Sequence, residues 1–250
     1  MRRGGKRVDA TSTARHLRIT RVGRILALSA CAVALPAVAD DTVFEGYDAF
    51  YATLPDPLFT MADERTLDGL QSFDGQAFRA WGELPAQGAR PTPGAHRVEV
   101  LGPDIRIDGR NLPVARAVVF PGEDATEVGA DARLFVGARD LCLQGVAPTS
   151  SGTAQRHVHV RLVVDAFTSR ARRYDLPSLF GSCLQLTRSA RGGVRFFAAR
   201  YHASEEASQP DGIVFDGWQL HGGAFARTTA SMRVVFAEPD DVYRFRRAPP

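Results

Sequence analysis

Apolar and polar residues alternate along much of the chain after residue 95, a pattern typical of strands that bury one face. In the segment 156–167, every even position from 158 to 166 is apolar, whereas the odd positions begin with His157, His159 and Arg161. We therefore expect a strand whose odd side chains face solvent. Similar patterns predict further strands near 98–100, 105–107, 115–120, 132–136, 141–146, 183–188, 194–201, 213–220, 232–237 and 242–245.

Short strands in succession, without helical crossovers between them, predict a mainly β fold with antiparallel pairing. Asp108-Gly109 stands between alternating segments and predicts a tight hairpin turn, because both residues tolerate a positive φ. We expect an antiparallel β-sandwich or jelly-roll-like domain over 95–250, with a β-barrel as the alternative.

Residues 40–94 have a different pattern. Segments 47–54 and 62–70 each predict a short helix, and Pro55 ends the first. Prolines and glycines cluster in 86–94 and indicate a loop or boundary. We expect 40–94 to be a partly helical segment packed on the main β domain.

The first 39 residues have the features of a secretory signal peptide. Eight basic residues precede an apolar run over 25–39, which ends in Ala37-Val38-Ala39. The run is shorter than the roughly 20 residues of a membrane-spanning helix, and no later apolar stretch is long enough to span. We expect cleavage before Asp40 and a periplasmic or secreted protein.

Cys31 raises a second mode of export. Leu28-Ser29-Ala30-Cys31 looks like a lipobox, the site at which bacterial lipoproteins are cut and acylated. The apolar run continues past Cys31 to the Ala-x-Ala site, so we favour free secretion over a lipid anchor at Cys31.

Charge argues against a nucleic-acid partner. The leader holds eight of the 31 basic residues but one of the 28 acidic residues, so its removal leaves a net charge near −4. Arg170, Arg172 and Arg173 form a local basic group, which we interpret as a solvated turn. The sole lysine is Lys6, which excludes Schiff-base and P-loop chemistry after cleavage.

Two cysteines remain after cleavage, Cys142 and Cys183. An even number of cysteines in an oxidising compartment predicts a disulfide between them, with two buried thiols as the alternative.

The strongest candidate for metal chemistry is His157-x-His159, because side chains at i and i+2 of a strand share a face and can reach one ion. A third ligand would have to come from elsewhere, such as His202, His221 or Asp165. The simpler interpretation is two solvated histidines on the exposed face of a strand.

Tyr201, Trp218 and Phe225 border a polar loop and are candidates for ligand binding, although core packing also explains them. No catalytic motif is recognised, and we expect no cofactor. The leading hypothesis is an exported, non-catalytic β domain that binds a protein, an envelope component or a carbohydrate. The alternative is a metal-dependent enzyme or metal-binding protein centred on His157 and His159.

Overall fold

The computed structural model describes part of the chain in detail: residues 42–69, 71–73, 76–82, 95–113, 118–120, 123, 127–129, 131–190, 192–205 and 208–249. The expected signal peptide, Cys31 and the loop at 86–94 lie outside the described residues. Among the described residues, no helix combines the length and apolar character needed to cross a bilayer.

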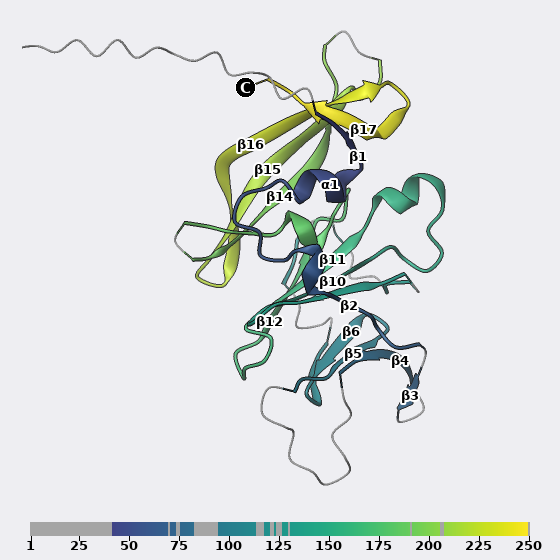
Figure 1. Ribbon diagram of the computed structural model, residues 1–250, viewed down its shortest axis with the longest axis vertical. Coiled ribbons are helices and arrows are strands. Elements are labelled where there is room, and N and C mark those ends of the chain that lie inside the picture. Colours follow the sequence, from purple (N-terminus) through teal and green to yellow (C-terminus); the bar gives the residue numbers. More distant parts are fainter. Residues whose placement is uncertain are drawn as a thin grey trace, which may run out of the picture. The chain divides into compact units, whose positions relative to one another are not determined.

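The fold is mainly β with antiparallel sheets, as the alternation predicts (Figure 1). The C-terminal sheet contains long, curved strands and has the order β1-β17-β16-β15-β14-β13. Its strands are β1 (Val43–Glu45), β13 (Thr187–Arg188), β14 (Val194–His202), β15 (Gly212–His221), β16 (Ala224–Glu238) and β17 (Asp241–Arg247).

A second six-stranded sheet, which we call the middle sheet, has the order β2-β9-β10-β11-β12-β8. Its pairs are antiparallel except β12 with β8, which is parallel. Its strands are β2 (Glu64–Arg65), β8 (Val118–Val119), β9 (Arg133–Val136), β10 (Leu141–Gly145), β11 (His159–Val164) and β12 (Arg172–Leu176).

The five-stranded sheet has the order β3-β4-β5-β6-β7. The turn between β6 and β7 is the predicted hairpin: Ile107 pairs with Arg110, and Asp108 and Gly109 have φ values of 50° and 77°. The strands of the five-stranded sheet are β3 (Gln71–Phe73), β4 (Gln76–Trp81), β5 (Val98–Leu101), β6 (Asp104–Ile107) and β7 (Arg110–Leu112).

Helices are short. The first expected helix is present as α1 (Tyr47–Tyr51), but the second, over 62–70, is wrong. Met61–Asp63 makes a single 3₁₀ turn, and Glu64–Arg65 then pairs with β9 as strand β2. Tertiary strand pairing has overridden the local helical preference. Two further 3₁₀ turns are Gly152–Arg156 (η3) and Cys183–Gln185 (η4); η4 replaces the start of the strand expected at 183–188.

The described part of 40–94 supplies strands to all three sheets: β1 to the C-terminal sheet, β2 to the middle sheet, and β3 and β4 to the five-stranded sheet. This segment is therefore part of every sheet, in addition to contributing α1.

The first hydrophobic core is rich in aromatic rings and joins the C-terminal sheet, α1 and one face of the middle sheet. Phe50 of α1 lies 5.2 Å from Phe215 and 5.7 Å from Phe245, centroid to centroid. Leu162 and Tyr174 enter this core from the middle sheet. Rings at these separations add attraction beyond the area that they bury, so α1 is held firmly against the C-terminal sheet.

The second core contains residues of the five-stranded sheet and the other face of the middle sheet. Val163 is fully buried there, and Arg161 is 1% exposed. The expectation that the odd positions of 156–167 face solvent is therefore wrong at Arg161 and Val163; His157 is exposed, but His159 is half-buried. A second layer of sheet covers that face, so this strand is buried on both sides along much of its length.

Arg161 is an unusual member of this buried face. No described residue accepts a hydrogen bond from its Nη1 or Nη2. Burial lowers the pKa of its guanidinium to about 10, and the neighbouring charge of Arg173 adds to this effect. The hydrophobic contacts around it must offset a desolvation cost of several kcal/mol.

The predicted disulfide joins Cys142 of β10 to Cys183 of η4, with a Cα–Cα distance of 5.8 Å. Both cysteines are fully buried in the first core. The bond attaches the segment that leads into the C-terminal sheet to the centre of the middle sheet.

The disulfide should be a major source of stability. It closes a loop with a sequence separation of 41 residues. The chain-entropy model gives about 4 kcal/mol for a loop of this size. We expect Cys142→Ala/Cys183→Ala to lower the free energy of unfolding by about that amount in urea titrations. The wild type in reductant is the control and should behave like the variant; a loss under about 1 kcal/mol in both would contradict this prediction.

Candidate functional site: an aromatic pocket beside the disulfide

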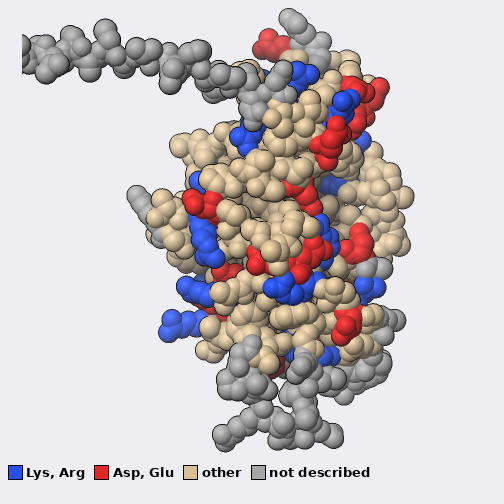
Figure 2. Space-filling view, in the orientation of Figure 1, with Lys and Arg blue, Asp and Glu red and all other residues tan. Residues whose placement is uncertain are grey.

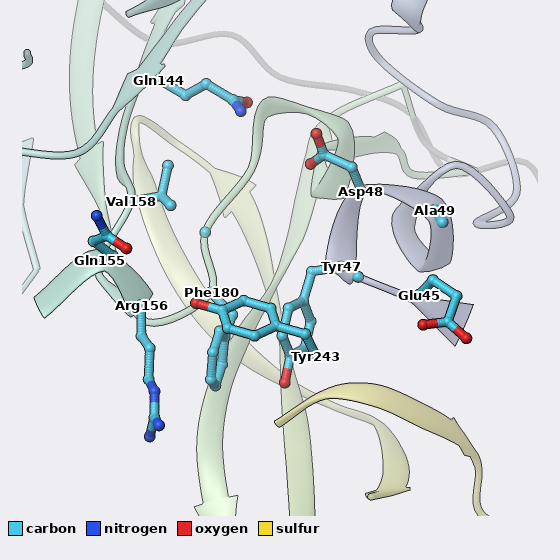
Figure 3. A pocket seen from close by; sticks show the side chains of 12 residues that line it. Glu45, Tyr47, Asp48, Ala49, Gln144, Gln155, Arg156, Val158, Phe180 and Tyr243 are labelled. Carbon is cyan, nitrogen blue, oxygen red and sulfur yellow. The ribbon is translucent and has the colours of Figure 1, made fainter. Parts of the chain in front are cut away.

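A pocket of about 260 Å³ is lined by residues of α1, β10, β17, the end of η3 and the loop before η4 (Figure 3). Figure 3 shows two different walls: the side chains of Gln144 and Asp48 lie on one side, and the rings of Tyr47, Phe180 and Tyr243 lie together on the other. The pocket therefore offers apolar ring surfaces opposite hydrogen-bonding groups.

The aromatic wall is a packed group of three rings. Tyr47 stacks on Phe180 with centroids 4.1 Å apart, and Tyr243 meets both rings edge-on at 6.0 and 5.9 Å. Tyr47 and Phe180 are buried, but Tyr243 is 44% exposed. Tyr243 is thus the ring most open to a ligand, and the other two hold it in place.

Phe180 has a backbone conformation that is rare for a bulky residue. Its φ is 50°, in the left-handed region, which costs of order 1–3 kcal/mol. Two buried hydrogen bonds hold it there: its N–H donates to the carbonyl of Arg156 at 2.6 Å, and its carbonyl accepts from the Tyr51 hydroxyl at 2.9 Å. Such conformations cluster at functional sites, because the surrounding structure must impose them.

Hydrogen bonds from the segment that carries the disulfide hold the polar wall in place. Gln144 Oε1 accepts a hydrogen bond from the Cys183 N–H at 2.6 Å. The Ser182 hydroxyl donates to Asp48 Oδ1 at 2.6 Å, and Asp48 Oδ2 lies 2.7 Å from Nη1 of Arg133. These bonds orient the two side chains of the polar wall.

Arg133 also binds Glu64 through two hydrogen bonds of 2.9 and 2.8 Å. The hydrogen bond from Arg133 lowers the pKa of the Glu64 carboxyl. One guanidinium thus pairs with two carboxylates, and this arrangement attaches α1 to β2 and β9.

The tyrosines of the pocket stay protonated at neutral pH. Burial raises the pKa of both Tyr47 and Tyr243 above the ordinary value of 10.0. The Tyr47 hydroxyl donates to the carbonyl of Val242 at 2.8 Å, so it is already engaged. The Tyr243 hydroxyl is the better placed of the two to meet a ligand.

Tyr201, Trp218 and Phe225, the predicted ligand-binding residues, do not form one site. Trp218 and Phe225 belong to an aromatic cluster with Phe196 and Phe120, with centroid distances of 4.9–6.4 Å. Trp218 pairs across strands with Phe196, five positions from Tyr201 on β14, which corresponds to a separation of about 17 Å.

Tyr201 does not line the aromatic pocket but contacts two residues that do. Its hydroxyl accepts a hydrogen bond from Nη1 of Arg156 at 2.8 Å, and its ring meets Phe180 edge-on at 5.9 Å. Tyr201 therefore orients Arg156, which lines the pocket, and packs against Phe180.

His157 and His159 precede and begin β11, but their surroundings differ. His157 is exposed and its Nδ1 lies 3.0 Å from the Ser178 hydroxyl. His159 is half-buried, and burial together with the charge of Arg161 lowers the pKa of its imidazole. A nearby guanidinium also opposes the binding of a metal cation.

No group of three or more potential metal ligands occurs among the described residues. Two of the possible third ligands have other partners. Nδ1 of His202 lies 2.8 Å from Asp211, and Asp165 forms an ion pair with Arg139 at 2.5 Å.

Sequence reasoning missed Arg156, Phe180 and Tyr243 as site residues. They come from three separate segments, and no local motif marks them.

A metal analysis tests the histidine alternative. We expect protein purified without a histidine tag to contain zinc, copper, iron and manganese far below stoichiometric amounts, because Arg161 opposes a cation beside His159. The His157→Ala/His159→Ala variant should show the same content. Stoichiometric metal that disappears in the variant would contradict this prediction.

Comparison with known proteins gives no relative for this site. No family model matches the chain, and neither the curated proteins nor the solved structures include a match. Functional assignment therefore depends on the geometry of the pocket.

Proposed function

We propose that this protein is an exported, non-catalytic binding protein whose aromatic pocket takes a carbohydrate. The observation that supports this most is the half-exposed ring of Tyr243, which faces the amide and carboxylate groups of Gln144 and Asp48 across the pocket. Sugars have apolar C–H faces that pack on aromatic rings and hydroxyl groups that bond to amides and carboxylates.

The size of the pocket limits the ligand. At about 260 Å³, it lies just below the roughly 300–1,000 Å³ typical of small-molecule sites. A single sugar unit, or the end of a longer chain, suits this volume better than an extended ligand.

The chemistry of the lining supports binding more than catalysis. The described lining residues include no serine, cysteine or histidine. Asp48 is engaged by Arg133 and Ser182, Glu45 pairs with Arg244, and the tyrosine hydroxyls stay protonated at neutral pH. These groups serve well as fixed hydrogen-bonding partners.

One further observation supports the proposal of an exported protein. The disulfide between Cys142 and Cys183 is typical of an oxidising compartment. A separate observation concerns the ligand: on the face drawn in Figure 2, acidic and basic side chains are interspersed, which favours local contacts over long-range attraction on that face.

Glycan-array screening followed by calorimetric titration tests this function. We expect at least one saccharide to bind, and Tyr243→Ala to weaken that binding about tenfold or more, because it removes the exposed stacking surface. Tyr243→Phe keeps the ring and should lose less affinity.

Val118→Ala is the control, because it removes another exposed apolar side chain that does not line the aromatic pocket. It should bind like the wild type. Failure of every saccharide to bind, or unchanged affinity in Tyr243→Ala, would contradict the proposal; capture of a protein partner by the same surface would instead favour a protein ligand.

A further inference from the structure

Two adjoining hollows of about 390 and 530 Å³ form a second concave region, which we call the arginine groove. They share four lining residues, and none of their lining residues belongs to the aromatic pocket. Arginines come to the groove from β7, β12 and the loop before β12: Arg110, Arg170, Arg172 and Arg173.

The side chain of Arg172 reaches from the middle sheet to the C-terminal sheet. It starts on β12 of the middle sheet, and its Nη1 lies directly over Gly223, in the turn between β15 and β16. Gly223 has a φ of 89°, and a Cβ there would collide with Nη1. Tyr174 donates a hydrogen bond to the Gly223 carbonyl at 3.1 Å, which fixes the turn beneath the guanidinium.

Arg110 contributes a charge that no acid of the described chain balances. Its two Nη groups donate to the carbonyls of Ala166, at 2.9 Å, and Thr168. Its Nε is buried and has no partner among the described residues. Carbonyl acceptors orient a guanidinium but leave its full positive charge in place.

Arg173, in contrast, is neutralised. It is buried and forms a two-pronged pair with Asp175, with both N–O distances at 2.8 Å. A further bond to the Pro103 carbonyl at 2.7 Å makes it part of the wall. The groove therefore owes its charge to the other arginines.

Asp165 is the sole acid among the described lining residues, and Arg139 pairs with it at 2.5 Å. Arg170 and Arg172 are exposed, and no described acid forms an ion pair with either. Arg110, Arg170 and Arg172 thus leave three unbalanced positive charges around one concavity.

We propose that the arginine groove binds a phosphoryl anion carried on a small polar molecule or headgroup. A guanidinium presents parallel N–H donors that match two phosphate oxygens. Such charge-assisted hydrogen bonds are stronger than hydrogen bonds between neutral groups. The expected net charge after removal of the leader is near −4, so the molecule as a whole does not attract anions. Binding at this groove has to come from the local arrangement, and it does not depend on carbohydrate binding at the aromatic pocket.

Calorimetric titration with inositol hexakisphosphate tests the proposal on the processed protein. We expect saturable binding that weakens as salt is raised, because exposed charges are screened. Arg170→Gln/Arg172→Gln should lower the affinity about tenfold or more. Both side chains are exposed, so the variant should keep the wild-type circular dichroism spectrum.

Arg188→Gln/Arg233→Gln is the matched control. It removes the same number of exposed charges from residues that do not line the groove, so its affinity should equal that of the wild type. No binding to the wild type, or equal losses in both double variants, would overturn the proposal.

A second titration distinguishes the source of the phosphoryl group. Vesicles of phosphatidylcholine that also contain phosphatidylglycerol present an anionic phosphodiester on a membrane surface, and vesicles of phosphatidylcholine alone, which carry no net charge, are the control. Binding that requires phosphatidylglycerol, is lost in Arg170→Gln/Arg172→Gln and is kept in Arg188→Gln/Arg233→Gln would identify a lipid headgroup as the ligand. If vesicles do not bind but inositol hexakisphosphate does, the ligand is a free phosphorylated molecule.

Discussion

The fold depends on burying both faces of the middle sheet. Leu141 and Leu143 of β10 enter the second core, whereas Cys142, between them, enters the first, and all three are fully buried. Antiparallel sheets commonly leave one face in water. Here the five-stranded sheet covers one face and the C-terminal sheet with α1 covers the other, so neither cover can be removed without exposing β10 and β11.

This constraint also explains how the aromatic pocket is built. Gln144 lies on β10, and the disulfide and the Gln144–Cys183 hydrogen bond attach the loop containing Phe180 to that strand. α1 brings Tyr47 to the same place, because Phe50 is packed among rings of the C-terminal sheet. The pocket is therefore positioned by the same contacts that hold the sheets together. The arginine groove has a comparable origin, since β7, β12 and the β15–β16 turn all contribute to it.

Much of the β structure could be predicted from local pattern. Alternation located β9, β10, β14, β15 and β17, and Asp108-Gly109 identified the β6–β7 turn. The cysteine count predicted the disulfide. These predictions succeed because strand period, turn conformation and thiol chemistry are properties of short segments or of composition.

Features that require knowledge of distant neighbours could not be predicted. Arg172 and Arg173 resemble a solvated turn in sequence, but they belong to β12, where Asp175 neutralises Arg173. From the sequence, Arg161 is expected to be an exposed strand residue. In the structure, the five-stranded sheet covers it. Tyr47, Phe180 and Tyr243 are far apart in the chain, and only the tertiary structure brings their rings together.

Native-state hydrogen exchange measures the central claim most directly. If the middle sheet is the doubly covered centre of the fold, the amides of β10 and β11 should exchange only through global unfolding, with a free energy equal to that from denaturant titration. The largely exposed segment 224–233 of β16 should exchange much faster, through local opening. If β10 and β11 exchanged as fast as that segment, the two-core account of this protein would be contradicted.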